Sequence, residues 1–195
     1  MNASVIVRPA RPADVNVIHR LITDNLEIGR LLPRTADDIA RCVSRFVVAA
    51  LQNDEQEVVG CAELAPLSNG VAEVRSLVVA EGYRGRHIGS TLVNQLAMAG
   101  ADRGFATLCA FTHQPSHFVG MGFTIVPHMS VPEKISHDCT SCSLFRRCGQ
   151  QAVMLPLRAG AVVGPERPAA VIHGSRPAAG RRLAPHPEST EAVPA

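Results

Sequence analysis

A short basic segment, Arg84-Gly85-Arg86-His87-Ile88-Gly89, has the residue types and the spacing of an anion-binding turn. An apolar run precedes it, and a segment with helical periodicity follows it directly. The start of a helix offers unpaired backbone N–H groups and the positive end of the helix dipole, and glycine lets the backbone approach a phosphate closely. Arg84 and Arg86 add positive charge at the same place. The sequence therefore predicts a phosphate site between a strand over 71–79 and a helix that begins near Ile88.

This turn resembles the acyl-CoA pyrophosphate loop of the GNAT N-acetyltransferase superfamily, whose pattern is Gln or Arg, two residues, Gly, one residue, and Gly or Ala. His87 stands where the family usually has its central glycine, and it could still donate its backbone N–H if its φ is negative. An ordinary solvated turn is the alternative. The resemblance implies acetyl-CoA as cosubstrate, bound by the end of the strand and by the turn: Leu77, Val78, Val79, Arg84, Gly85, Arg86, His87, Ile88, Gly89 and Ser90.

Acetyl transfer to an amine requires a neutral amine, stabilisation of an oxyanion and a proton for the departing thiolate. Glu73 lies where several GNAT enzymes carry a catalytic glutamate, so the resemblance implies that it is the general base. The alternative is an exposed strand residue paired with a neighbouring arginine. The resemblance also implies that the sheet splays beyond this strand and leaves a backbone N–H near Leu77 or Val78 for the oxyanion.

The general acid is less clearly marked in the sequence. Many GNAT enzymes place a tyrosine in the short helix before a Gly-Phe pair, but this position is Phe118 here. Ser116 could hydrogen bond to the leaving sulfur as the second catalytic residue, although a serine after Pro115 is more typical of a helix N-cap. The CoA thiol, with a pKa near ~8.5 by analogy with cysteine, could also leave without a strong acid.

Three stretches narrow the resemblance to the short, single-domain bacterial N-acetylglutamate synthases. Two are RLLPRT at 30–35 and LVVAEGYR at 77–84. The third, VPEKISHDCTSCSLFRRC at 131–148, contains the PEK, DC, second Cys, Phe and third Cys of that group's C-terminal segment. The resemblance implies L-glutamate as the acceptor amine and N-acetyl-L-glutamate, the first intermediate of arginine biosynthesis, as the product.

Glutamate carries two carboxylates, so its pocket needs cationic donors, preferably the bidentate fork of arginine. The candidates lie on segments that border the acceptor side in this fold, and each could equally be a solvated surface charge. Arg34 and Lys134 are the preferred pair, because both fall within the family-like stretches. The substrate-binding candidates are Arg34, Arg75, Lys134 and Arg147.

The cysteines fall into two groups. Cys42, Cys61 and Cys109 stand singly in apolar or amphipathic surroundings and are interpreted as reduced core thiols. Cys139, Cys142 and Cys148 could bind zinc together with His137, but this group lacks the two tight pairs of a structural site. We predict no metal and interpret these thiols as packing an irregular loop, with a reversible disulfide as a lesser alternative.

The pattern of apolar residues places these groups on a succession of strands and helices. Strands are predicted over 4–8, 46–51, 58–64, 71–79, 106–111, 124–126 and 152–157. Helices are predicted after an N-cap at Asp14, over about 35–44, from Ile88 to a stop at Arg103-Gly104, and over 116–121. This order matches the GNAT order over residues 4–157, and it predicts an α/β fold of the mixed α+β type, with a mostly antiparallel, splayed sheet flanked by helices.

Composition limits the organisation of the chain and its partners. With 195 residues, 46% of them hydrophobic and 4% aromatic, the chain is expected to form one aliphatic core within residues 1–158. Residues 159–195 contain six prolines among 37 residues and are expected to be a disordered tail. A net charge of +2 does not favour nucleic acid as a partner.

No apolar stretch approaches the roughly 20 residues that cross a bilayer, and the N-terminus lacks a signal-peptide pattern, so a cytoplasmic protein without a membrane partner is expected. A homodimer is compatible with the sequence. Two alternatives to glutamate acetylation stay open. One is an acetyltransferase for another amino-acid or peptide amine. The other is a non-catalytic acetyl-CoA-binding module, to which His87 and Phe118 point.

Overall fold

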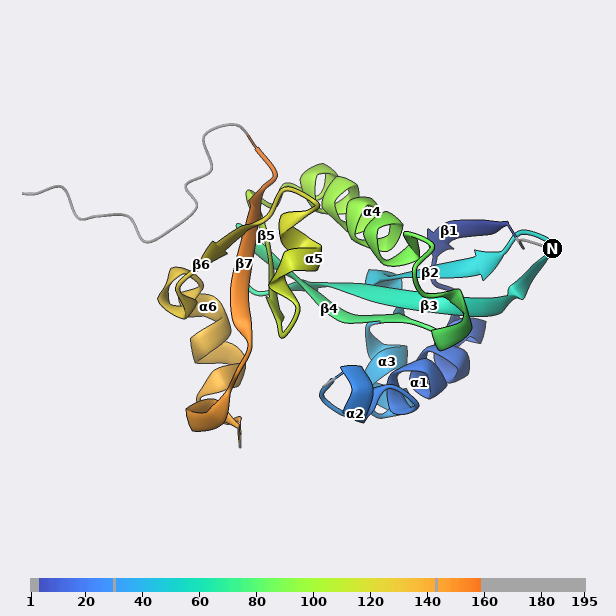
Figure 1. Cartoon of the computed structure of the whole chain (residues 1–195), viewed down its shortest axis with the longest axis horizontal. Helices are drawn as coiled ribbons and strands as arrows, with labels where there is room; N and C mark the ends of the chain where they lie inside the picture. The colour runs from blue at the N-terminus through green and yellow to red at the C-terminus, as the bar shows by residue number, and fades with distance from the viewer. Residues whose placement is uncertain (1–3, 30, 143, 159–195) are drawn as a thin grey trace, which may run out of the picture.

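The computed structural model describes residues 4–29, 31–142 and 144–158. In this part of the chain a seven-stranded sheet is flanked by helices on both faces (Figure 1). The strand order is β1-β2-β3-β4-β5-β7-β6, and every neighbouring pair is antiparallel except β4 and β5. The predicted mixed fold with a mostly antiparallel sheet is confirmed. The expected tail over 159–195 lies outside the described residues.

The strands are β1 (Val5–Pro9), β2 (Phe46–Leu51), β3 (Asp54–Pro66), β4 (Val71–Val79), β5 (Thr107–Thr112), β6 (Thr124–Val126) and β7 (Gln151–Pro156). The α-helices are α1 (Val15–Thr23), α2 (Leu26–Gly29), α3 (Ala36–Arg41), α4 (Ile88–Asp102), α5 (Pro115–Val119) and α6 (Pro132–Lys134). Short 3-10 turns are η1 (Pro12–Asp14), η2 (Val43–Arg45), η3 (Glu81–Tyr83), η4 (His128–Ser130) and η6 (Phe145–Arg147), and η5 (Ile135–Cys139) is a π-helical segment.

Most predicted boundaries are correct within two residues, two differ by more, and the short helices α2 and α6 were not predicted. Strand β3 begins at Asp54 instead of Val58, because its exposed polar start is held by pairing with β2 and carries no apolar pattern. The helix expected over 35–44 ends at Arg41, since Cys42 leaves helical geometry with φ −128° and a 3-10 turn follows. Helix α2 is an addition to the expected elements.

The two predicted N-caps behave differently. The Thr35 hydroxyl accepts a hydrogen bond of 3.1 Å from the Asp38 backbone N–H and so caps α3 as predicted. Asp14 directly precedes α1, but its carboxylate accepts instead from the Arg8 guanidinium, at 2.8 and 3.0 Å, and from the Arg11 backbone N–H at 2.6 Å. Asp14 therefore anchors the start of α1 to β1 through a buried ion pair.

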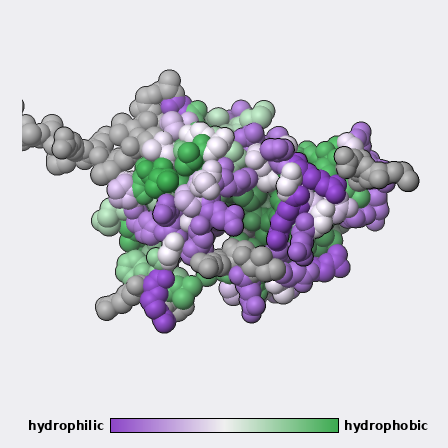
Figure 2. All heavy atoms as spheres, in the orientation of Figure 1, coloured by the Kyte–Doolittle hydropathy of each residue, from purple (hydrophilic) through white to green (hydrophobic). Residues whose placement is uncertain are grey.

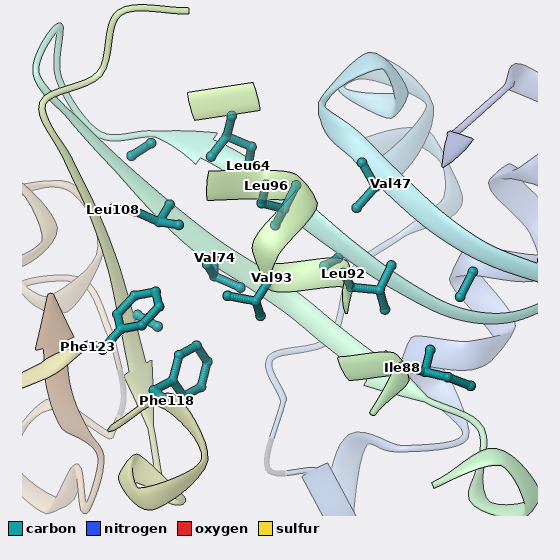
Figure 3. Close-up of a cluster of buried hydrophobic side chains, with 14 of the residues drawn as sticks. Val47, Leu64, Val74, Ile88, Leu92, Val93, Leu96, Leu108, Phe118 and Phe123 are labelled. Atoms are coloured by element: carbon teal, nitrogen blue, oxygen red, sulfur yellow. The ribbon is translucent and has the colours of Figure 1, made fainter. Parts of the chain in front are cut away.

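The core has a layer on each face of the sheet. On one face, the predicted stripe of α4 packs on inward-facing strand residues, and Figure 3 shows Ile88, Leu92, Val93 and Leu96 turned toward the strands. On the opposite face, the α1 residues Ile18 and Ile22 join a second buried cluster on β2, β3 and β4. A third cluster, on that same face but nearer β7, covers the strands beneath the 128–151 segment. Residues of β4 that point away from α4 therefore lie between the second and third clusters.

On the face seen in Figure 2, hydrophilic side chains cover most of the surface and hydrophobic ones gather in a few places. Within the described residues, none of the helices combines the length and the apolar character that a membrane crossing requires.

The sheet opens in the middle of β4. Pairing between β4 and β5 covers three positions, from Val71 with Thr107 to Glu73 with Cys109, although both strands continue beyond them. On its other side, β4 contains a bulge next to Ser76, whose φ is +51°, and the register with β3 shifts there. Strand β5 pairs with β7 along its whole length. The splay implied by the sequence is therefore present and begins directly after Glu73.

Candidate functional site

The basic loop joins the end of β4 to the start of α4 as predicted. Its backbone passes through the left-handed region twice, at Gly85 with φ +74° and at His87 with φ +58°. His87 therefore does not have the negative φ on which donation by its backbone N–H was made conditional. Histidine is among the residues that enter this region more readily than most, so the turn keeps a glycine-like path with a side chain present. Helix α4 follows directly, and its first N–H groups, from Ile88 to Ser90, have no intrahelical acceptor.

The two loop arginines are placed differently. The Arg84 guanidinium donates from Nε to the Val79 carbonyl at 3.1 Å, and from Nη2 to the Asn25 side-chain oxygen. It therefore ties the loop to the end of β4 and to the turn after α1. Arg86 stacks on Tyr83 with 5.2 Å between its Cζ and the ring centroid. Asn25, which is buried, carries no signal in the sequence that links it to the loop.

The short helix α5 lies against the start of α4. A Cβ atom on Gly89 would lie 3.4 Å from Nε2 of His117 and 3.9 Å from a methyl group of Val79. Ser116 is the second residue of α5 and is exposed, and the N-cap is Gln114, so the N-cap interpretation of Ser116 is wrong. Phe118 is buried with Phe123 in the core, where Figure 3 shows both rings.

A set of six charged side chains lies on the face of the sheet opposite α4, next to the point where β4 and β5 separate. They come from the loop before α3, from β3, from β4 and from the α6–η5 segment. Figure 1 shows these elements around the middle of β4. We refer to this set as the charged network: Arg34, Glu63, Glu73, Arg75, Lys134 and Asp138.

Glu73 is at the centre of the charged network and is 3% exposed. Its carboxylate accepts from Lys134 Nζ, at 2.8 Å to Oε1 and 3.0 Å to Oε2, and from Nε of Arg75. The alternative interpretation of Glu73 is therefore half correct: it pairs with the neighbouring arginine, but it is buried. It is also the last residue of β4 that pairs with β5.

Asp138 is a second carboxylate that contacts the same two cations, Lys134 and Arg75. Its Oδ2 atom accepts from Lys134 Nζ at 2.8 Å and also from Nη2 of Arg75. Burial alone would raise the pKa of Asp138, but the hydrogen bond from Lys134 and the charge of Arg75 outweigh burial and leave it lowered. Burial likewise opposes the charge on Arg75, and the carboxylates of Glu73 and Asp138 outweigh that effect and raise the pKa of Arg75.

Arg34 and Glu63 form the other part of the charged network. Arg34 pairs with Oε2 of Glu63, donates to Sγ of Cys42 at 3.2 Å and stacks on the Phe46 ring at 5.7 Å. Glu63 is 2% exposed and lies opposite Arg75 in the register between β3 and β4. The sequence analysis missed Glu63, although an acidic residue within the apolar run of β3 is the signal that could have identified it.

Of the four predicted substrate-binding residues, Arg75 and Lys134 meet at Glu73, Arg34 pairs with Glu63, and the fourth lies elsewhere. Arg147 is exposed on η6, outside the charged network. The three cysteines of this segment are free: Cys139 and Cys142 are half-buried, and Cys148 is exposed. Among residues 4–29, 31–142 and 144–158, no three His, Cys, Asp or Glu side chains are grouped as metal ligands are.

The three remaining cysteines are free and buried, which confirms the prediction of core thiols for Cys42, Cys61 and Cys109. Burial raises the pKa of Cys61 to about 12. These thiols are therefore protonated at neutral pH and are not poised as nucleophiles.

Comparison with known proteins identifies a family. The model of the acetyltransferase (GNAT) family matches residues 18–123. The uncharacterized N-acetyltransferase CT2212 of Chlorobaculum tepidum is 30% identical over 155 residues, which are 80% of this chain and 98% of that protein.

Two solved structures share the fold. Rv2747 of Mycobacterium tuberculosis, in complex with CoA and NLQ, has a TM-score of 0.69 and 24% identity, over 78% of this chain and 99% of that one. N-acetylglutamate synthase of Neisseria gonorrhoeae, complexed with coenzyme A and N-acetyl-glutamate, has a TM-score of 0.70 and 22% identity, over 81% of this chain and 36% of that one.

Proposed function

The chain belongs to the GNAT family of acetyltransferases and uses acetyl-CoA as its cosubstrate, and from this premise we propose that its acceptor is the α-amine of L-glutamate. The product is N-acetyl-L-glutamate. The observation that carries the proposal is that Arg75 and Lys134 meet at Glu73, where the sheet opens, while Arg34 pairs with Glu63 on the neighbouring strand. Cations are the donors that the two carboxylates of glutamate require, and the carboxylate of Glu73 suits its amine.

In this proposal the CoA pyrophosphate binds at the start of α4. The N–H groups from Ile88 to Ser90 point along the helix dipole, and Arg86 adds charge at the mouth of the loop. The acyl arm of the cosubstrate lies in the opening between β4 and β5. The backbone N–H of Leu77 or Val78, beyond the bulge at Ser76, binds the oxyanion as it develops.

The chemical step is direct attack of the neutral amine on the thioester carbonyl. Glu73 accepts the proton that the ammonium group loses, either directly or through one water molecule. A bond forms between the amine nitrogen and the carbonyl carbon, the bond from that carbon to sulfur breaks, and the electron pair leaves with the thiolate. The nitrogen loses its second proton as the amide forms, and the thiolate takes up one proton to leave as the thiol. Ser116, exposed on α5, hydrogen bonds to the departing sulfur.

The N-acetylglutamate synthase of Neisseria gonorrhoeae, which shares this fold over 36% of its chain and was solved in complex with coenzyme A and N-acetyl-glutamate, adds support for this acceptor. One observation favours a second candidate. The three cations of the charged network are balanced by Glu63, Glu73 and Asp138, and a balanced site also suits an amino acid with no net charge.

The test is the rate of CoA thiol release from acetyl-CoA with each of the twenty amino acids in turn. We expect L-glutamate to give the highest rate and mass spectrometry to identify N-acetyl-glutamate. A highest rate with a neutral amino acid would support the second candidate. Thiol release with none of the twenty, from protein that binds acetyl-CoA, would refute both and leave a peptide amine or a non-catalytic module.

A further inference from the structure

The charged network contains one carboxylate that differs from the other two in its position and its exposure. Glu63 and Glu73 lie on central strands, and their side chains are 3% and 4% exposed. Asp138 lies in η5, outside the sheet, and its side chain is 30% exposed. It can therefore leave the network by a local change of its own segment, without disturbing the sheet.

The contacts of Asp138 are those that a bound carboxylate would make. A single oxygen, Oδ2, lies between Nζ of Lys134 and Nη2 of Arg75, on cations that come from different elements. The segment that carries it is a π-helical turn, a rare conformation that frequently occurs at functional sites. Asp138 itself lies on neither a strand nor a long helix.

The charges give the same indication. With Asp138 in place, three cations face three carboxylates, and the network has no net charge. If Asp138 leaves, the network carries one net positive charge. L-Glutamate, with two carboxylates and one ammonium group, carries one net negative charge and matches the network without Asp138.

We propose, on the basis of the proposed function, that Asp138 occupies the position of the acceptor's side-chain carboxylate and is exchanged for it when the acceptor binds. In this exchange Lys134 and Arg75 release Oδ2 of Asp138 and donate instead to an oxygen of the acceptor's carboxylate. An amino acid without a second carboxylate offers nothing to replace Asp138. Asp138 is therefore a specificity-determining residue, which selects an acidic acceptor and lowers the apparent affinity for it by occupying its position.

The direct test is the binding of glutarate, a dicarboxylate without an amine, to the full chain by calorimetry at low salt. We expect Asp138→Asn to bind glutarate roughly tenfold more tightly than the unmodified protein, because the internal competitor is gone. The control is Asp102→Asn, which removes an exposed carboxylate at the end of α4 and should leave glutarate binding unchanged. Equal or weaker binding to Asp138→Asn would overturn the proposal.

A second measurement, on the unmodified protein, tests the proposal even if Asp138→Asn fails to fold. Hydrogen exchange of the unmodified protein should become faster over 135–139 when glutarate is added, since Asp138 is released. Slower or unchanged exchange there would also overturn the proposal. The proposed function is tested by a different result. If L-glutamate supports no thiol release while Asp138→Asn still binds glutarate more tightly, the exchange of Asp138 for a dicarboxylate is supported and glutamate as the acceptor is refuted.

Discussion

Lys134 and Glu73 lie 61 residues apart in the sequence and form a salt bridge of 2.8 Å between Nζ and Oε1. One belongs to the segment after β6 and the other to the strand that leads to the CoA loop. The contact brings the proposed acceptor-binding segment to the proposed general base. Arg75 and Lys134, the two cations that contact Glu73, are also candidates for binding the acceptor. The proposed base and the proposed acceptor site therefore share the same two cations.

Replacement of Glu73 tests the proposed base. Glu73→Gln should lower kcat by roughly 10²- to 10⁴-fold, the effect of losing a positioned general base, with little change in acetyl-CoA affinity. The deficit should shrink as pH rises, because more of the amine is then already neutral. The measurement is the pH profile of kcat, with the exposed Glu81→Gln as control. A full kcat at neutral pH would remove Glu73 from catalysis.

Replacement of Arg34 tests whether this residue binds the acceptor or only stabilises the fold. Arg34→Met should raise the KM for L-glutamate by roughly 10- to 100-fold, the effect of losing a charge-assisted hydrogen bond, and leave kcat nearly unchanged. The variant should also melt at a lower temperature, because it leaves the buried carboxylate of Glu63 without its cation.

The double variant Arg34→Met/Glu63→Gln provides the control for this prediction. It should recover much of the melting temperature, since neither partner is then left as a buried unpaired charge, while the KM stays high. If the KM recovers together with the melting temperature, the role of Arg34 is structural.

The start of α4 is tested at Gly89. Gly89→Val should raise the KM for acetyl-CoA at least tenfold, because the branched side chain must displace His117 or Val79 and cover the N–H groups of the helix start. Gly89→Ala should have a small effect, since its Cβ meets His117 at 3.4 Å, an ordinary contact. Gly82→Ala, whose Cβ meets nothing within 4 Å, is the control. An unchanged KM in Gly89→Val would exclude this helix start from CoA binding.

The buried pair of Arg8 and Asp14 predicts a pH dependence of stability. Burial alone would raise the pKa of Asp14, but hydrogen bonds from Arg8 and the Arg11 N–H leave it below the ordinary 3.8. A lowered folded-state pKa stabilises the protein fully above the unfolded value of about 3.8, and this contribution is lost as pH falls through the folded value. Asp14→Asn should therefore lower the free energy of unfolding at pH 7 by roughly 3–5 kcal/mol.

The measurement is chemical unfolding of both proteins at pH 7 and near pH 3. The difference between them should decrease at the lower pH, where Asp14 of the unmodified protein is increasingly protonated. A constant difference at both pH values would show that the charge of Asp14 contributes nothing to stability.

The parts of the fold that the sequence predicted well are those with a strong local signal. Strand β4, the basic loop and the apolar stripe of α4 follow from an apolar run, glycine and a period of 3.6, and all three lie where they were expected. The start of β3 carries no such signal, because its polar residues become a strand only through pairing with β2.

The contacts of the charged network could not be predicted from residue spacing. Lys134 and Arg75 were singled out by resemblance, but their meeting at Glu73 and Asp138 depends on tertiary packing of segments far apart in the chain. Glu63 was missed because its partner, Arg34, is fixed by the loop before α3. The φ of His87 is likewise set by the path of the turn and not by the residue type.

The central claim is that the charged network recognises an acidic amino acid, and the ratio of kcat/KM for L-glutamate to that for L-glutamine tests it most directly. The two acceptors have nearly the same shape and differ by the charge of one group. If the second carboxylate of glutamate takes the place of Asp138 between Arg75 and Lys134, we expect a ratio of at least roughly 10². The amide of glutamine would leave those two cations poorly paired. A ratio near one would contradict recognition of the second carboxylate by the charged network.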